Sequence, residues 1–81
     1  MLNYNFDKND DILYVTIGYP IPSYGEEDIE GIILRKSMQT HELAGITILD
    51  FRDRLKNHKE DLSSLPITLN LKEIENKILC A

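Results

Sequence analysis

Oxygen-bearing side chains alternate near the N-terminus, at Asp7, Asn9 and Asp11. A calcium-binding loop begins in this way, but that loop also needs a glycine at its sixth position and a glutamate at its twelfth. Ile12 and Gly18 stand at those positions. Asn and Asp also favour tight turns, because their side chains bond to nearby amides. The pattern therefore predicts a solvated hairpin turn, and we expect no bound metal.

The same segment offers a weaker catalytic alternative. Residues four apart on a strand share a face, so Asp7 and Asp11 would converge as a general acid and base of a hydrolase. No histidine, metal-ligand set or predicted pocket accompanies the pair. We therefore expect a chain that is not an enzyme and that has no catalytic residues.

The metal-ligating residue types are too few and too scattered to build a site. His41 and His58 are the only imidazoles and Cys80 is the only thiol, so no zinc-ligand spacing is present. We expect His58 to pack on an apolar helical stripe and His41 to be solvated in a turn. Cys80 is close to the C-terminus, where chains fray. The sequence predicts no cofactor.

Basic residues recur at helical spacing at Arg52, Lys56 and Lys59. Such a face binds phosphate or an acidic partner. Acidic residues are interleaved with it and dilute its field: Asp53, Glu60 and Asp61. The alternative that the composition favours is a solvated helix face laced with ion pairs.

The segment 18–28 carries the candidate partner-binding residues, Tyr19, Ile21 and Tyr24. Its two prolines and two glycines forbid a helix and weaken any strand. Tyrosine is common at binding hot spots, and a proline-stiffened segment loses little entropy on binding. The other interpretation is that these side chains fold back as a lid on a small core.

The elements that position these residues can be predicted from hydrophobic periodicity. Alternation predicts four strands, at 2–7, 12–17, 29–36 and 44–49. Their short links leave no room for a crossover helix, which favours an antiparallel meander. Spacings of three and four predict a helix at 51–62, with Asp50 as N-cap, and a second at 71–79, capped by Asn70. We expect one α+β domain over 1–81, with both helices on one face of the sheet.

Composition limits the partners of the chain. The 81 residues are 42% hydrophobic and 28% charged, with a net charge of −5. An acidic surface repels phosphate backbones, so we expect no nucleic-acid partner, whereas it attracts basic proteins. No apolar run is long enough for a membrane helix, and the first residues do not form a signal peptide. We therefore expect a cytoplasmic domain without a membrane partner.

Three blocks in the first fifty-five residues suggest a family. Residues 6–15, Phe-Asp-Lys-Asn-Asp-Asp-Ile-Leu-Tyr-Val, resemble the opening of the bacterial family named domain of unknown function 2283. Residues 30–34 and 45–50 look like its second and third blocks, in the same order and at fitting spacings. The resemblance covers about residues 4–55. It implies a small β-rich domain without an established activity. It also suggests an association with small ribonuclease-like toxins in bacterial gene pairs.

Two functions then compete. The first is a small protein-binding domain, an antitoxin-like neutraliser of a small basic ribonuclease-like partner, which contacts that partner through Tyr19, Ile21 and Tyr24. The second is a structural domain that forms homodimers or larger homo-oligomers and has no catalytic activity, because small sheets often protect an edge by pairing with a copy of themselves.

Overall fold

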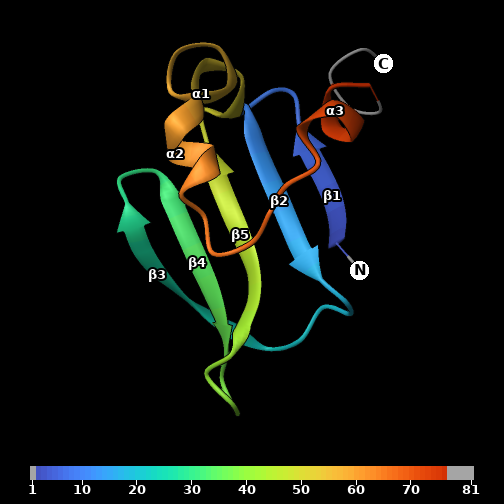
Figure 1. Ribbon diagram of the computed structural model, residues 1–81. Helices are drawn as coiled ribbons and strands as arrows, with labels where there is room; N and C mark the ends of the chain where they lie inside the picture. The colour runs from blue at the N-terminus through green and yellow to red at the C-terminus, as the bar shows by residue number, and fades with distance from the viewer. Residues whose placement is uncertain (1, 77–81) are drawn as a thin grey trace.

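The structure is a computed structural model that describes residues 2–76. Within this range one sheet precedes three short helices (Figure 1). The strands are β1 (Leu2–Asp7), β2 (Ile12–Ile17), β3 (Ser23–Ile29), β4 (Ile32–Ser37) and β5 (Leu43–Leu49), and the helices are α1 (Phe51–Asn57), α2 (Lys59–Ser63) and α3 (Leu71–Ile74). All strand pairs are antiparallel, and the helices lie on one face. The predicted α+β class is confirmed.

The sheet joins a hairpin to a meander. Its strand order is β1-β2-β5-β4-β3, so β5 lies between β2 and β4. β1 and β2 form the hairpin, β3, β4 and β5 follow one another as the meander, and the β2–β5 pair connects the two parts. In that central pair Leu13 lies opposite Ile48 and Val15 opposite Ile46, so their side chains form one apolar face.

The prediction of an irregular segment at 18–28 was wrong over its second half, which forms β3. Gly25 and the acidic run at 26–28 are unfavourable in strands, which is why periodicity gave no signal there. β3 tolerates them because it is an edge strand: it needs hydrogen bonds on one side only, and its acidic side chains stay exposed. The strand predicted at 29–36 begins at Ile32 instead, as β4, because Glu30 and Gly31 form a turn in which φ of Gly31 is 85°.

The predicted helix at 51–62 is interrupted at His58, whose φ is −137° and ψ is 47°. Phe51 and Leu62 still reach the core, but His58 is exposed, so the prediction that it packs on the apolar stripe was wrong. Asn70 caps α3 as predicted, because its Oδ1 accepts a hydrogen bond from the amide of Glu73 at 3.0 Å. The end of the predicted helix 71–79, like Cys80, lies outside the described residues.

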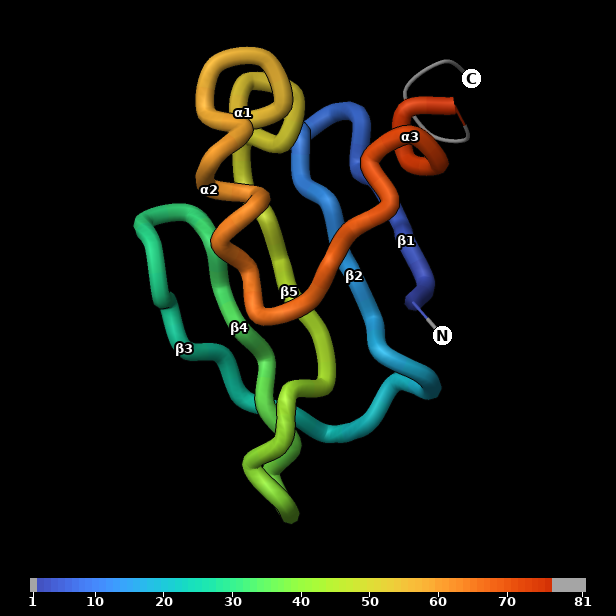
Figure 2. The backbone as a smooth tube through the Cα atoms, viewed as in Figure 1, coloured from blue at the N-terminus to red at the C-terminus, as the bar shows by residue number. Residues whose placement is uncertain are grey.

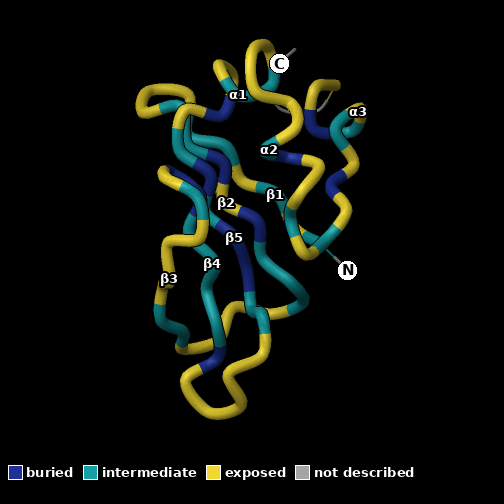
Figure 3. Tube along the Cα trace, turned by 60° about the vertical axis from the view of Figure 1, so that its left-hand side comes forward, coloured by how far each residue is buried: buried dark blue, intermediate teal, exposed yellow. Residues whose placement is uncertain are grey.

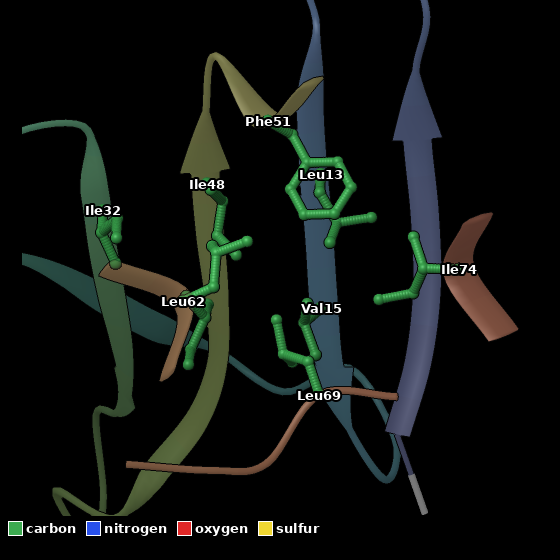
Figure 4. Packing of buried hydrophobic residues seen from close by; sticks show 9 residues of the cluster. Leu13, Val15, Ile32, Ile48, Phe51, Leu62, Leu69 and Ile74 are labelled. Carbon is green, nitrogen blue, oxygen red and sulfur yellow. The ribbon is translucent and has the colours of Figure 1, made fainter. Parts of the chain in front are cut away.

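The core fills the space between the sheet and the segment that follows it. Its centre is lined by Leu13, Val15, Ile32, Ile46, Ile48, Phe51, Leu62, Leu69 and Ile74, all buried. Figure 4 shows side chains of β2, β4 and β5 pointing to the same side, toward Phe51, Leu62, Leu69 and Ile74. The chain from α2 to α3 crosses in front of β5 and β2 (Figure 2). This extended link holds Leu69 against the sheet.

Candidate functional site

The connection between β2 and β3 is fixed at both of its ends. At its start the side-chain amide of Asn3 donates a hydrogen bond to the carbonyl of Gly18 at 3.0 Å, where φ of Gly18 is 66°. At its end the carbonyl of Pro22 accepts a hydrogen bond from the amide of Met38 at 3.2 Å. Two prolines restrict the backbone between these anchors. The loop is therefore held in place without contributing to the core.

Large apolar side chains are exposed at this end of the molecule. Tyr19 is 88% exposed, Ile21 49% and Met38 62%. Met38 belongs to the β4–β5 turn, which the Pro22–Met38 hydrogen bond brings beside the β2–β3 loop. We call Tyr19, Ile21 and Met38 the loop-end patch. Their exposure argues against the alternative in which Tyr19 and Ile21 cover the core. The sequence did contain a signal for Met38, because it is a lone large apolar residue in a polar turn.

Tyr24 lies in β3, beside the loop-end patch. Its hydroxyl is 2.9 Å from Nδ1 of His41, and the two rings meet edge to face with centroids 5.9 Å apart. The buried Ser37 organises the same turn, because its hydroxyl accepts hydrogen bonds from the amides of Gln39 and Thr40. His41 is exposed, as predicted. The Tyr24–His41 contact joins β3 to the β4–β5 turn beside the patch.

An open pocket of about 530 Å³ lies at the other end of the sheet, between the β3–β4 turn and the α1–α2 segment. Five carboxylates line it: Glu27, Glu30, Asp50, Asp53 and Asp61. Several are occupied by local bonds, since Glu27 accepts from the amide of Gly31 and Asp53 from the side chain of Asn57. Among residues 2–76 no cluster of histidine, cysteine and acidic side chains is arranged to hold a metal ion. The pocket gives this end a negative potential.

Arg54 organises that end, and sequence reasoning missed it. Its side chain is 11% exposed and bonds to Asp61 at 3.0 Å and to the carbonyl of Leu49 at 2.8 Å. It also donates to the carbonyl of Glu30, and its guanidinium occupies the space that a side chain at Gly31 would need. Each of the three nitrogens of the Arg54 guanidinium thus donates a hydrogen bond within the fold, so Arg54 has a structural role. The carboxylates outnumber it in the pocket lining.

The aspartates of the first turn are also structural. Asp7 Oδ1 accepts hydrogen bonds from the amides of Asn9 and Asp10, which confirms the predicted hairpin turn. Asp11 lies in the turn rather than on a strand, so it does not share a strand face with Asp7. The carbonyl and carboxylate of Asp11 accept hydrogen bonds from the first two amides of α1. The predicted N-cap, Asp50, makes no such side-chain bond.

The basic face that was the weaker alternative for Arg52, Lys56 and Lys59 does not form as one helical stripe. Arg52 bonds to Asp11 at 3.0 Å and lies over the ring of Phe6, 5.6 Å from its centroid. The break at His58 places Lys59 in α2, apart from Arg52 and Lys56 in α1. The ion-paired alternative is therefore confirmed for Arg52, and no continuous cationic stripe remains.

Comparisons with protein-family models, with curated proteins and with solved structures find no match for this chain. The resemblance of residues 4–55 to domain of unknown function 2283 therefore stays a prediction. None of the helices within residues 2–76 has the length and apolar character needed to cross a membrane.

Proposed function

We propose that this chain is a small protein-binding domain that captures a basic partner through the loop-end patch. The observation that carries the proposal is the exposure of Tyr19, Ile21 and Met38 on two neighbouring, anchored connections. Clustered exposed apolar side chains mark binding surfaces, whereas single ones need no explanation. Both connections are held by hydrogen bonds in the free chain, which lowers the entropy lost when a partner binds.

The charge of the chain supports a basic partner. The net charge of −5 steers cationic proteins toward the surface and raises their association rate. The acidic pocket at the other end of the sheet and the exposed acidic residues along β3 add to this field. A small ribonuclease-like protein fits this description, because enzymes that bind RNA carry basic surfaces. Capture of such an enzyme would make the chain an antitoxin-like neutraliser without catalysis of its own.

The test is an affinity capture from the native host with matched variants. The patch variant is Tyr19→Ser/Ile21→Ser, and the control is Tyr14→Ser, because Tyr14 is also exposed but lies in β2 on the sheet. We expect one basic protein to be enriched by the wild type and the control, and lost with the patch variant. Equal capture by all three proteins would contradict the proposal.

A second step tests the neutraliser role directly. The captured partner is purified and its cleavage of a fluorescent RNA is measured with increasing amounts of the wild type or the patch variant. The wild type is expected to stop cleavage at equimolar concentration, and the patch variant to leave it unchanged. Cleavage that continues at saturation would reduce the proposal to binding without neutralisation.

A homo-oligomeric structural role is the alternative, and one surface favours it. Tyr14 is 36% exposed on the sheet face opposite the helices, where cross-strand pairing places it beside Thr47 and sets Thr47 beside Ile33. Figure 1 shows the helices on the other face only. A second copy that covered this face would bury those side chains. Light scattering at high concentration separates the two roles: a mass of one chain excludes the oligomer, whereas a multiple that Tyr14→Ser reduces to one chain supports it.

A further inference from the structure

The outer edge of β3 is the other unusual surface of this molecule. β3 is the last strand of the sheet and pairs with β4. Within residues 2–76, β4 is the only element with which β3 makes more than occasional contacts, and Figures 1 and 2 show no helix or loop against its outer side. The backbone groups that face outward there are open to hydrogen bonds from another strand.

The accessible stretch is regular enough to act as a template. Ser23 to Glu27 pairs in unbroken register with Ser37 to Ile33, and the register shifts only between Glu27 and Ile29. At about 3.4 Å per residue this stretch is roughly 17 Å long. Gly25, Glu26, Glu27 and Asp28 are all exposed, and Figure 3 shows the exposed run along β3.

The charges on this edge favour a basic strand as its binding partner. Glu26, Glu27, Asp28 and Glu30 lie in or just after β3, and no lysine or arginine occurs between Ser23 and Gly31. Lys36 of β4 neutralises part of this charge through its 3.2 Å ion pair with Glu26. A second copy of β3 would set acidic side chains against one another, which destabilises a strand pair. A strand that carries arginine or lysine would find opposite charges instead.

We propose that the outer edge of β3 binds an extended basic segment of the protein partner, which joins the sheet as a sixth strand. This inference rests on the proposed function and specifies how the partner is recognised. Main-chain hydrogen bonds to β3 would supply affinity, and the acidic side chains would supply specificity. The 18–22 loop adjoins this edge, because Ser23 directly follows it, and from there the loop turns beneath the sheet toward β2 (Figure 2). A segment that runs past Ser23 therefore meets the end of the loop that carries Ile21 and Pro22.

The test measures, by fluorescence anisotropy, the binding of a short synthetic peptide of alternating arginine and valine to the full chain. In two further peptides the backbone amides are N-methylated at odd or at even positions. In a strand pair only one of these sets faces the template. We expect one N-methylated peptide to bind at least about tenfold more weakly, because it loses hydrogen bonds to β3. The other should bind within about twofold of the parent. Equal affinities for both would overturn the proposal, as would equal binding of a glutamate–valine peptide.

Charge variants locate the docked peptide on the protein. Glu27→Lys/Asp28→Lys reverses the charge of the β3 edge, and Glu60→Lys/Glu75→Lys makes the same change in net charge on exposed positions of the helical segment. The β3 variant should lose peptide binding at least about tenfold by weakened attraction, while the control should lose much less. Equal losses would show attraction by net charge alone and would overturn docking at β3.

The same variants separate this inference from the proposed function. If capture of the host partner depends on the loop-end patch but not on Glu27 and Asp28, only the β3 proposal fails. Peptide docking that follows the strand register, combined with host capture that is indifferent to the patch, would overturn the proposed role of the patch and leave the β3 edge standing.

Discussion

The two edge strands of the sheet differ in what holds them. β1 is anchored to distant parts of the chain: Phe6 packs edge to face on Phe51 with ring centroids 6.0 Å apart, and the hydroxyl of Tyr4 accepts a hydrogen bond from the amide of Asn70. β3 is held mainly by its pairing with β4, with Ile29 against the core and the Tyr24–His41 contact to the β4–β5 turn as its further links within the described residues. One edge of the sheet therefore packs against the rest of the fold, whereas the other leaves its outer backbone groups uncovered within the described residues.

The sequences of the two strands show the origin of this difference. β1 alternates Leu2, Tyr4 and Phe6 with polar residues, so that one row of side chains meets the helices. β3 carries an acidic run instead and presents four consecutive exposed residues at 25–28. Strand β3 therefore gains its order from hydrogen bonds to β4 and contributes little apolar burial. We expect substitutions on β3 to lower the free energy of unfolding less than substitutions on β1, and to weaken the binding of a partner more.

The largest expected effect comes from breaking the anchor of β1. Phe6→Ala removes the contact with Phe51 and the ring under Arg52, and should lower the free energy of unfolding by about 2–3 kcal/mol for a partly buried ring. Glu27→Lys/Asp28→Lys on β3 should lower it by only about 1 kcal/mol, chiefly through the lost hydrogen bond from the amide of Gly31 to Glu27. Urea unfolding followed by circular dichroism measures both. A similar decrease in the free energy of unfolding for the two variants would contradict the proposed difference between the two edges.

A smaller effect tests the link between the β1–β2 turn and α1. Asp11→Ala removes the carboxylate that binds Arg52 and its amide, and should cost about 1–2 kcal/mol. Asp11→Asn is the matched control, because asparagine keeps an acceptor oxygen and tolerates the φ of 56°. It should cost about half as much. Thermal unfolding of the three proteins gives the order, and an equally large loss for Asp11→Asn would show that the charge, rather than the cap, dominates.

The smallest expected effect lies on the β3 side. Tyr24→Phe removes the hydroxyl that bonds to His41 and should cost about 0.5 kcal/mol, because the bond is exposed to water. His41→Asn provides the second arm of a double-mutant cycle, since asparagine tolerates the φ of 64° at this position. A coupling energy near zero would mean that the Tyr24–His41 contact does not stiffen the turn beside the loop-end patch.

Much of the fold could be predicted because its signals are local. Alternating apolar residues predicted β1, β2 and β5, and the Asn70 cap was readable from its spacing to Glu73. β3 was missed because an edge strand does not need an apolar face. The break at His58 was missed because apolar spacing continues across it to Leu62. The error at β3 comes from tertiary pairing, which overrides a local pattern.

The candidate site was predictable only in part. Tyr19 and Ile21 were found because prolines hold two large side chains on a segment without periodicity. Met38 joins them only through the Pro22–Met38 hydrogen bond, and Arg54 gains its partners from Leu49, Glu30 and Asp61 in the folded chain. Contacts between segments distant in sequence leave no trace in local spacing, so the fold had to be known first.

Amide hydrogen exchange, followed residue by residue by NMR, tests the contrast between β1 and β3 most directly. It is measured on the free chain and on the chain saturated with the arginine–valine peptide. The account predicts that the outward-facing amides of β3 exchange fast in the free chain and at least about tenfold more slowly with the peptide, while the amides of β1 are unchanged. Slowed exchange in β1, with none in β3, would contradict the assignment of β3 as the binding edge.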